Sequence, residues 1–162
     1  MISTPRLTPE RFTPEEMRAW KALRVMSRQL EAHLARELAR TSILSMQDYD
    51  VLSSVATMPG HRWPAKRLMH HLQWSYSRLS HHLDRMEKRA LVTRERAAEG
   101  TGSDVVITEA GMAAIRAATS DHLSEVRRAF LDRLEPGDAN VITRLCADVI
   151  AGLPGPTPER GW

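Results

Sequence analysis

The sequence has a single cysteine and no long apolar run. Cys146 is the one thiol in 162 residues, so no disulfide forms within the chain, which fits a reducing compartment. No apolar stretch approaches the length of a membrane span, and residues 1–12 carry prolines and charges where a secretory signal needs an apolar core. We therefore expect a cytoplasmic protein that does not enter a membrane.

Motifs that carry chemistry are also missing. The sequence has no glycine-rich phosphate loop, no nucleophile elbow and no His-Glu-x-x-His motif. The pairs His70-His71 and His81-His82 suggest zinc, but neighbours on a helix point about 100° apart. No cysteine or carboxylate set stands at ligand spacing beside them. We expect no enzyme, no metal site and no cofactor.

The net charge is small but unevenly distributed. The chain has 23 Lys and Arg against 20 Asp and Glu, a net of +3 that does not by itself imply a polyanionic partner. Between His61 and Arg96, nine Lys and Arg stand against three Asp and Glu, a net of +6, and five of the seven histidines lie there. This segment is the candidate for contact with an acidic partner.

Apolar residues at intervals of three, four or seven predict a long helix near the N-terminus. Thr13-Pro14-Glu15-Glu16 marks its start, with threonine as the N-cap and glutamate three residues later, and the stripe continues to about Arg40. A second helix opens at Ser45, and Met58-Pro59-Gly60 ends it.

The middle of the chain predicts a helix-turn-helix followed by a hairpin. Residues 61–64 are short and extended, residues 65–72 form a brief helix, and Ser75 caps the next helix after a tight turn. Arg94 and Arg96 then alternate outward in a strand-like rhythm, and the chain returns after a glycine-containing tip. This order is typical of a winged helix.

Two further helices complete the pattern. Thr108 caps one that runs to the break at Glu135-Pro136-Gly137, and Asp138 caps the last. We expect a mainly α fold with a small β-wing, a winged helix-turn-helix flanked by long N- and C-terminal dimerisation helices. The expected parts are a flexible lead (1–12), an N-terminal dimerisation helix (13–44), the winged helix-turn-helix lobe (45–108), C-terminal dimerisation helices (109–153) and a flexible tail (154–162).

The helix that begins at Ser75 has two unlike faces. Its apolar side carries Leu79, Leu83, Met86 and Ala90, and the rest carries Ser77, Arg78, His81, Arg85 and Lys88. A polar face is most often only solvated, but the adjoining hairpin and the local positive charge favour contact with a nucleic acid. Lys88 and Arg89 are expected to be solvated, and Glu87 to pair with a neighbour for little energy.

Three segments, in this order and spacing, resemble the multiple antibiotic resistance regulator (MarR) family over about residues 15–152. They are Gln47-Asp48-Tyr49-Asp50-Val51-Leu52, the run from Ser75 to Val92, and Val106-Ile107-Thr108-Glu109-Ala110-Gly111. The resemblance implies a homodimeric transcriptional regulator, favoured as a repressor, that binds a pseudo-palindromic operator in double-stranded DNA and is released by a small aromatic effector. The alternative is a winged-helix interaction module whose basic face binds an acidic protein partner.

The resemblance places the polar face of residues 75–89 in a DNA major groove, which admits a helix and where arginine binds guanine. We expect Ser77, Arg78 and His81 at base edges, and Ser75, His82 and Arg85 at phosphates. Relatives carry an arginine near the wing tip that enters the minor groove. The tip here, residues 99–104, has none, so Arg94 and Arg96 at the wing base are the candidates to replace it.

An effector cavity is expected between the first helices and the DNA-binding lobe. Its candidate lining is Trp20, Met46, Tyr49 and Trp63, although such residues are more often core. Cys146 is expected to act as a small hydrophobe on the last helix rather than as a redox switch.

Overall fold

The computed structural model describes residues 12–97 and 101–154. The helices are α1 (Pro14–Thr41), α2 (Met46–Ala56), α3 (Ala65–His71), α4 (Tyr76–Lys88), α5 (Glu109–Ala129) and α6 (Asp138–Gly152), with 3₁₀ turns η1 (Pro59–His61) and η2 (Leu131–Arg133) and strands β1 (Arg62–Pro64), β2 (Val92–Arg96) and β3 (Ser103–Ile107). The predicted fold class, mainly α with a small β-wing, is confirmed. Within the described ranges no helix is long and apolar enough to cross a membrane.

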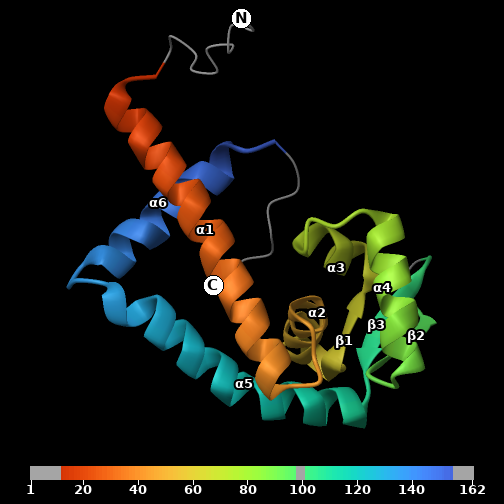
Figure 1. Cartoon of the computed structure of the whole chain (residues 1–162). Helices are drawn as coiled ribbons and strands as arrows, with labels where there is room; N and C mark the ends of the chain where they lie inside the picture. Colours follow the sequence, from red (N-terminus) through yellow and green to blue (C-terminus); the bar gives the residue numbers. More distant parts are fainter. Residues whose placement is uncertain (1–11, 98–100, 155–162) are drawn as a thin grey trace, which may run out of the picture.

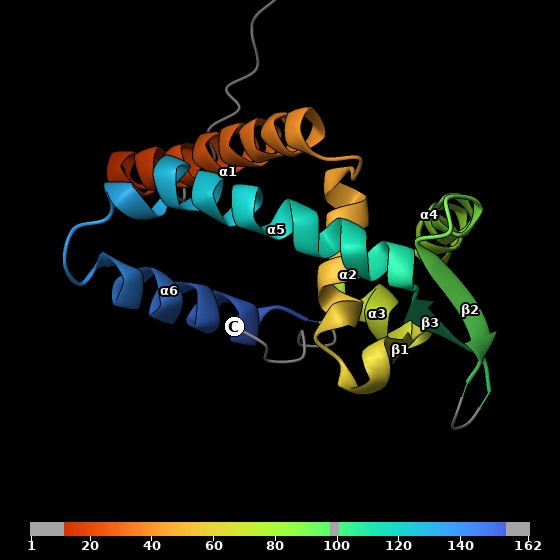
Figure 2. The same ribbon diagram turned by 90° about the horizontal axis from the view of Figure 1, so that it is seen from below.

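The elements form two groups. The long helices α1, α5 and α6 make one, and α2, α3, α4 and the sheet make the other (Figure 1). Figure 2 shows α1 and α5 side by side and running in opposite directions, with α6 apart from both. In the same view, α4 and the β2–β3 hairpin lie at the side of the molecule where α1 ends and α5 begins. The antiparallel sheet has the order β1-β3-β2, which places the hairpin beside α4.

Most predicted helix starts are confirmed. The side chains of Thr13, Ser45, Ser75 and Thr108 each accept a hydrogen bond from the backbone N–H three residues later, which satisfies a free donor of the first turn. The predicted cap at Asp138 is wrong. Gly137 holds that position at φ 97°, and the Asp138 carboxylate instead accepts a hydrogen bond from the backbone N–H of Glu135.

Two predicted helix ends also differ. α5 ends at Ala129, and the chain continues as the η2 turn. The sequence predicted a helix for five further residues, up to the break at Glu135. Ala90 was placed on the apolar face of the helix after Ser75, but α4 ends at Lys88 and Ala90 is exposed in a left-handed turn with φ 55°. The turn carries Ala90 off the helical period, so only the other three apolar residues reach the core.

The core lies under α4 and the sheet. Leu79, Leu83 and Met86 from α4 are buried against a cluster contributed by α2, α3 and all three strands. The start of α5 packs closely against this cluster at Gly111. A Cβ there would lie 2.0 Å from the Leu91 carbonyl oxygen, so the approach requires glycine. Thr108 fixes the same junction, since its hydroxyl donates to the carbonyl of Ala90 at 2.6 Å. The end of α4, the start of the wing and the start of α5 therefore meet at this junction.

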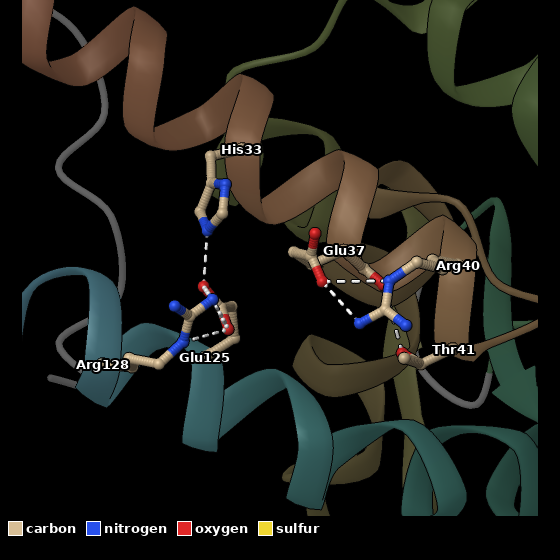
Figure 3. Close-up of polar contacts among 6 residues, drawn as sticks. All are labelled: His33, Glu37, Arg40, Thr41, Glu125 and Arg128. Atoms are coloured by element: carbon tan, nitrogen blue, oxygen red, sulfur yellow. Dashed lines mark hydrogen bonds and ion pairs between the residues drawn. The ribbon is translucent and has the colours of Figure 1, made fainter.

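Polar side chains link α1 to α5 (Figure 3). His33 Nε2 lies 2.5 Å from Glu125 Oε1, and Arg128 donates to both oxygens of the same carboxylate. The contacts with His33 and then Arg128 hold the pKa of Glu125 below its usual value. Figure 3 also shows the Arg40 guanidinium hydrogen-bonded to the Glu37 carboxylate, about one turn further along α1 than His33.

Candidate nucleic-acid interface

The exposed side of α4 carries a row of polar side chains. The buried residues Leu79, Leu83 and Met86 fix the rotation of the helix about its axis. Five polar residues consequently face solvent along α4: Ser77, Arg78, His81, Arg85 and Lys88. No acidic residue lies in the first turn, so the free N–H groups and the positive end of the helix dipole remain available to an anion.

Arg78 is held in place by an aromatic ring. Its guanidinium carbon lies 4.3 Å from the ring centroid of Trp74, a cation–π distance. Trp74 in turn meets His82 edge-on, with ring centroids 5.3 Å apart. Arg78 therefore stands at the first turn of α4 with its orientation restrained while its surface remains exposed.

His82 does not occupy the position predicted for it. We expected a phosphate contact, but the side chain is buried, with 6% of the residue exposed. Its Nε2 lies 3.0 Å from Asp48 Oδ1, close but without the angle of an aligned hydrogen bond, and Arg85 donates to its Nδ1 at 2.9 Å. Burial under α2 removes His82 from the surface, so the phosphate-contact prediction for it is corrected.

Asp48 is a residue that the sequence analysis missed. It stands three residues after Ser45, the spacing of a capping box, and its Oδ2 accepts the Ser45 backbone N–H at 2.9 Å. The same oxygen accepts Arg89 Nη1 at 2.7 Å, so the expectation that Arg89 is merely solvated is wrong. Burial alone would raise the pKa of Asp48, but the contacts with His82, Arg89 and Ser45 together lower it below its usual value.

A cationic groove results between α4 and the N-terminus of α2. It encloses about 500 Å³ and is lined by Ile43, Ser45, Gln47, Asp48, Arg78, His82, Arg85 and Arg89. Arg89 also donates to the Ile43 carbonyl at 2.7 Å, which joins the α1–α2 loop to α4. Three guanidinium groups line one flank of α4, and only one carboxylate lies among these lining residues.

The wing arginine Arg94 is engaged by α4. Its guanidinium donates to Glu87 Oε2 and to Asp84 Oδ1, both at 2.5 Å, and its backbone N–H donates to Glu87 Oε1 at 2.8 Å. The predicted pairing of Glu87 with a neighbour is confirmed. Through Nε and Nη2, Arg94 fixes the wing against α4. Its side chain is still 31% exposed, so the DNA contact expected of it stays a prediction. Arg96 is exposed, and residues 99–100 of the predicted tip lie outside the described residues.

The predicted effector residues are not brought together. Trp63 is 2% exposed in the core, where its ring packs against His71. Met46 and Tyr49 pack at the edge of that core, and Tyr49 contacts the His122 ring of α5. Trp20 lies about 30 Å along α1 from its C-terminal end, at 1.5 Å per residue. Within one chain, these four residues therefore do not line a common cavity, which corrects the prediction.

Tyr76 is a second residue that the sequence analysis missed. It is the first residue of α4 and is 79% exposed, beside the predicted contact residues Ser75 and Ser77. Its place directly after the Ser75 cap was the available signal. In residues 12–97 and 101–154, no three His, Cys, Asp or Glu side chains are grouped so that they could hold a metal ion.

Comparison with known proteins gives the family. No protein-family model matches the chain, and no curated protein sequence matches it significantly. Among solved structures, the MarR family transcriptional regulator AbsC from Streptomyces coelicolor is 31% identical at a TM-score of 0.82, over 90% of this chain and 100% of AbsC. Sco3205, a MarR family regulator from the same organism solved in complex with DNA, is 29% identical at a TM-score of 0.82, over 93% of this chain and 97% of Sco3205. Sco5413, a third regulator from this organism, is 16% identical at a TM-score of 0.72, over 85% of this chain and 94% of Sco5413, which shows the fold alone. At 31% identity over the whole of AbsC, the chain belongs to the MarR family of transcriptional regulators.

Proposed function

We propose that the protein is a homodimeric transcriptional regulator that binds a pseudo-palindromic DNA operator, with repression as its favoured role. The observation that carries this proposal is the exposed polar row of α4, which stands on a cationic lobe beside a wing. A helix of this kind fits a major groove, where arginine, serine and histidine donate to bases and phosphates. The structure of the relative Sco3205 in complex with DNA supports the same role here.

The proposed contact set follows the positions of the side chains. Ser77, Arg78 and His81 face bases from the first turns of α4, and Tyr76 joins them at its start. Phosphates meet Ser75, Arg85 and Arg96, three residues that are exposed around the same surface. Arg94 remains a candidate at the base of the wing, whereas the buried His82 acts behind this surface rather than on it.

A second copy of the chain is the proposed partner of the long helices. None of the 15 residues of α6 is buried, although Val141, Leu145 and Val149 form an apolar stripe on it. On α1, Trp20, Leu23 and Met26 are also exposed by 44–52%. A stripe of this kind marks an association surface. A two-fold dimer would place its α4 helices about one DNA turn, ~10 base pairs, apart.

Selection of bound duplexes from a fragmented genomic library of the source organism tests the proposal. The recovered duplex should be a pseudo-palindrome that binds at least ~10³-fold more tightly than a scrambled duplex, with affinity falling steeply as salt rises. Recovery of fragments without a shared sequence would contradict it, and would favour an acidic protein partner for the basic face.

A further inference from the structure

The contacts of His82 define which ring nitrogen carries its proton. A guanidinium only donates hydrogen bonds, so the His82 Nδ1 that receives Arg85 Nη2 at 2.9 Å must be the bare, accepting nitrogen. The proton of the neutral ring then lies on Nε2, the atom 3.0 Å from Asp48 Oδ1. A carboxylate beside Nε2 favours this tautomer over the one that would turn an N–H toward Arg85.

Asp48 is itself held in a fixed orientation. Its Oδ2 receives Arg89 and the Ser45 backbone N–H, which leaves Oδ1 directed at His82. Asp48 is 2% exposed and His82 is 6% exposed, so water does not replace either partner easily. Arg85, one turn of α4 later, is exposed and lines the cationic groove.

We propose that His82 is a positioning residue: it accepts a hydrogen bond from Arg85 and so holds that guanidinium on the α2-facing flank of α4, ready for a DNA phosphate, while Asp48 selects the tautomer that makes this possible. The inference rests on the proposed function and adds to it a role for two buried side chains. A long arginine side chain that is already restrained loses less conformational freedom when it binds. The expected gain in DNA affinity is about three- to tenfold for each half-site of the operator.

Two substitutions of His82 separate this role from a purely structural one. In His82→Asn, the amide stands near the position of Nδ1, so an acceptor for Arg85 is kept while the reach to Asp48 is lost. In His82→Gln, the amide reaches the position of Nε2, so Asp48 keeps a partner while Arg85 loses its acceptor. Positioning of Arg85 predicts DNA affinity within about twofold of the wild type for His82→Asn and about three- to tenfold weaker at each half-site for His82→Gln.

A structural tie between α2 and α4 predicts the opposite order, since only His82→Gln keeps the contact with Asp48. Each variant is measured on the duplex selected from the genomic library, with its melting temperature recorded. The same pair is then compared in an Arg85→Ala background, where the difference between them should vanish. Equal affinities of the two variants, or a persistent difference without Arg85, would overturn the inference.

A measurement on the unmodified protein covers the case in which a variant fails to fold. Nitrogen-15 NMR of the histidine rings at neutral pH reports which nitrogen is protonated, and His82 should carry its proton on Nε2 alone. A proton on Nδ1, in either the other tautomer or the doubly protonated ring, would overturn the inference. This result does not require DNA, so it still decides the His82 geometry if no duplex is bound and the proposed function fails.

Discussion

Replacing Arg78 by alanine should weaken binding of the selected duplex by at least ~30-fold. A bidentate arginine–guanine contact contributes about 1–3 kcal/mol of discrimination, and a dimer makes it twice. Arg78 is suited to this contact because it lies in the first turn of α4 and is restrained over Trp74. Titration of the labelled duplex with wild-type and variant protein measures the loss.

The control for Arg78→Ala is Arg133→Ala, which removes the same charge from the exposed η2 turn in the other group of helices. Its affinity should stay within about twofold of the wild type, because screening at physiological salt limits charge effects to about 8 Å. The Arg78 substitution should also spare binding to the scrambled duplex. An equal loss on both duplexes would assign Arg78 to a phosphate rather than to a base.

A glutamate in place of Leu145 should dissociate the dimer and reduce operator affinity by about 10²- to 10⁴-fold. Leu145 is 56% exposed at the middle of the apolar stripe of α6, so a charge there would be buried without a partner in the dimer. In a dimer, binding of the first half-site places the second binding surface at a high effective concentration near the second half-site, so the dimer binds the operator more tightly than a monomer does. Light scattering gives the mass, and titration of the duplex gives the affinity.

Thr143→Glu is the matched control, because Thr143 is exposed on the same helix and lies about 200° around the axis from Leu145. It should remain a dimer of normal affinity. A Leu145→Glu protein that is still dimeric and still binds the duplex would move the interface away from α6.

Local signals predicted the elements well, because helix caps and amphipathic spacing act over a few residues. Ser75 caps α4 through a hydrogen bond to the Arg78 backbone N–H, and Leu79, Leu83 and Met86 reach the core as their spacing indicates. A four-residue pattern contains the full information for such a cap. The same patterns contained too little information for the end of α5, where the helix gives way to the η2 turn before any proline.

The roles of individual side chains in the site depended on distant partners. His82 looked like a surface cation, but α2 covers it with Asp48, which lies 34 residues earlier in the sequence. Arg94 looked free, but the turn after α4 brings it back against Asp84 and Glu87. Trp63 looked like a cavity residue, but pairing of β1 with β3 places it opposite Val105 in the core. Only the tertiary arrangement shows these contacts.

Methylation interference on the selected duplex tests whether α4 of each protomer binds a major groove. Methyl groups on guanine N7 project into the major groove, whereas those on adenine N3 project into the minor groove. We expect interference from guanine N7 in two clusters about one helical turn apart, with one position in each cluster losing its effect in Arg78→Ala. Interference confined to adenine N3, or a single cluster of guanines, would contradict this expectation.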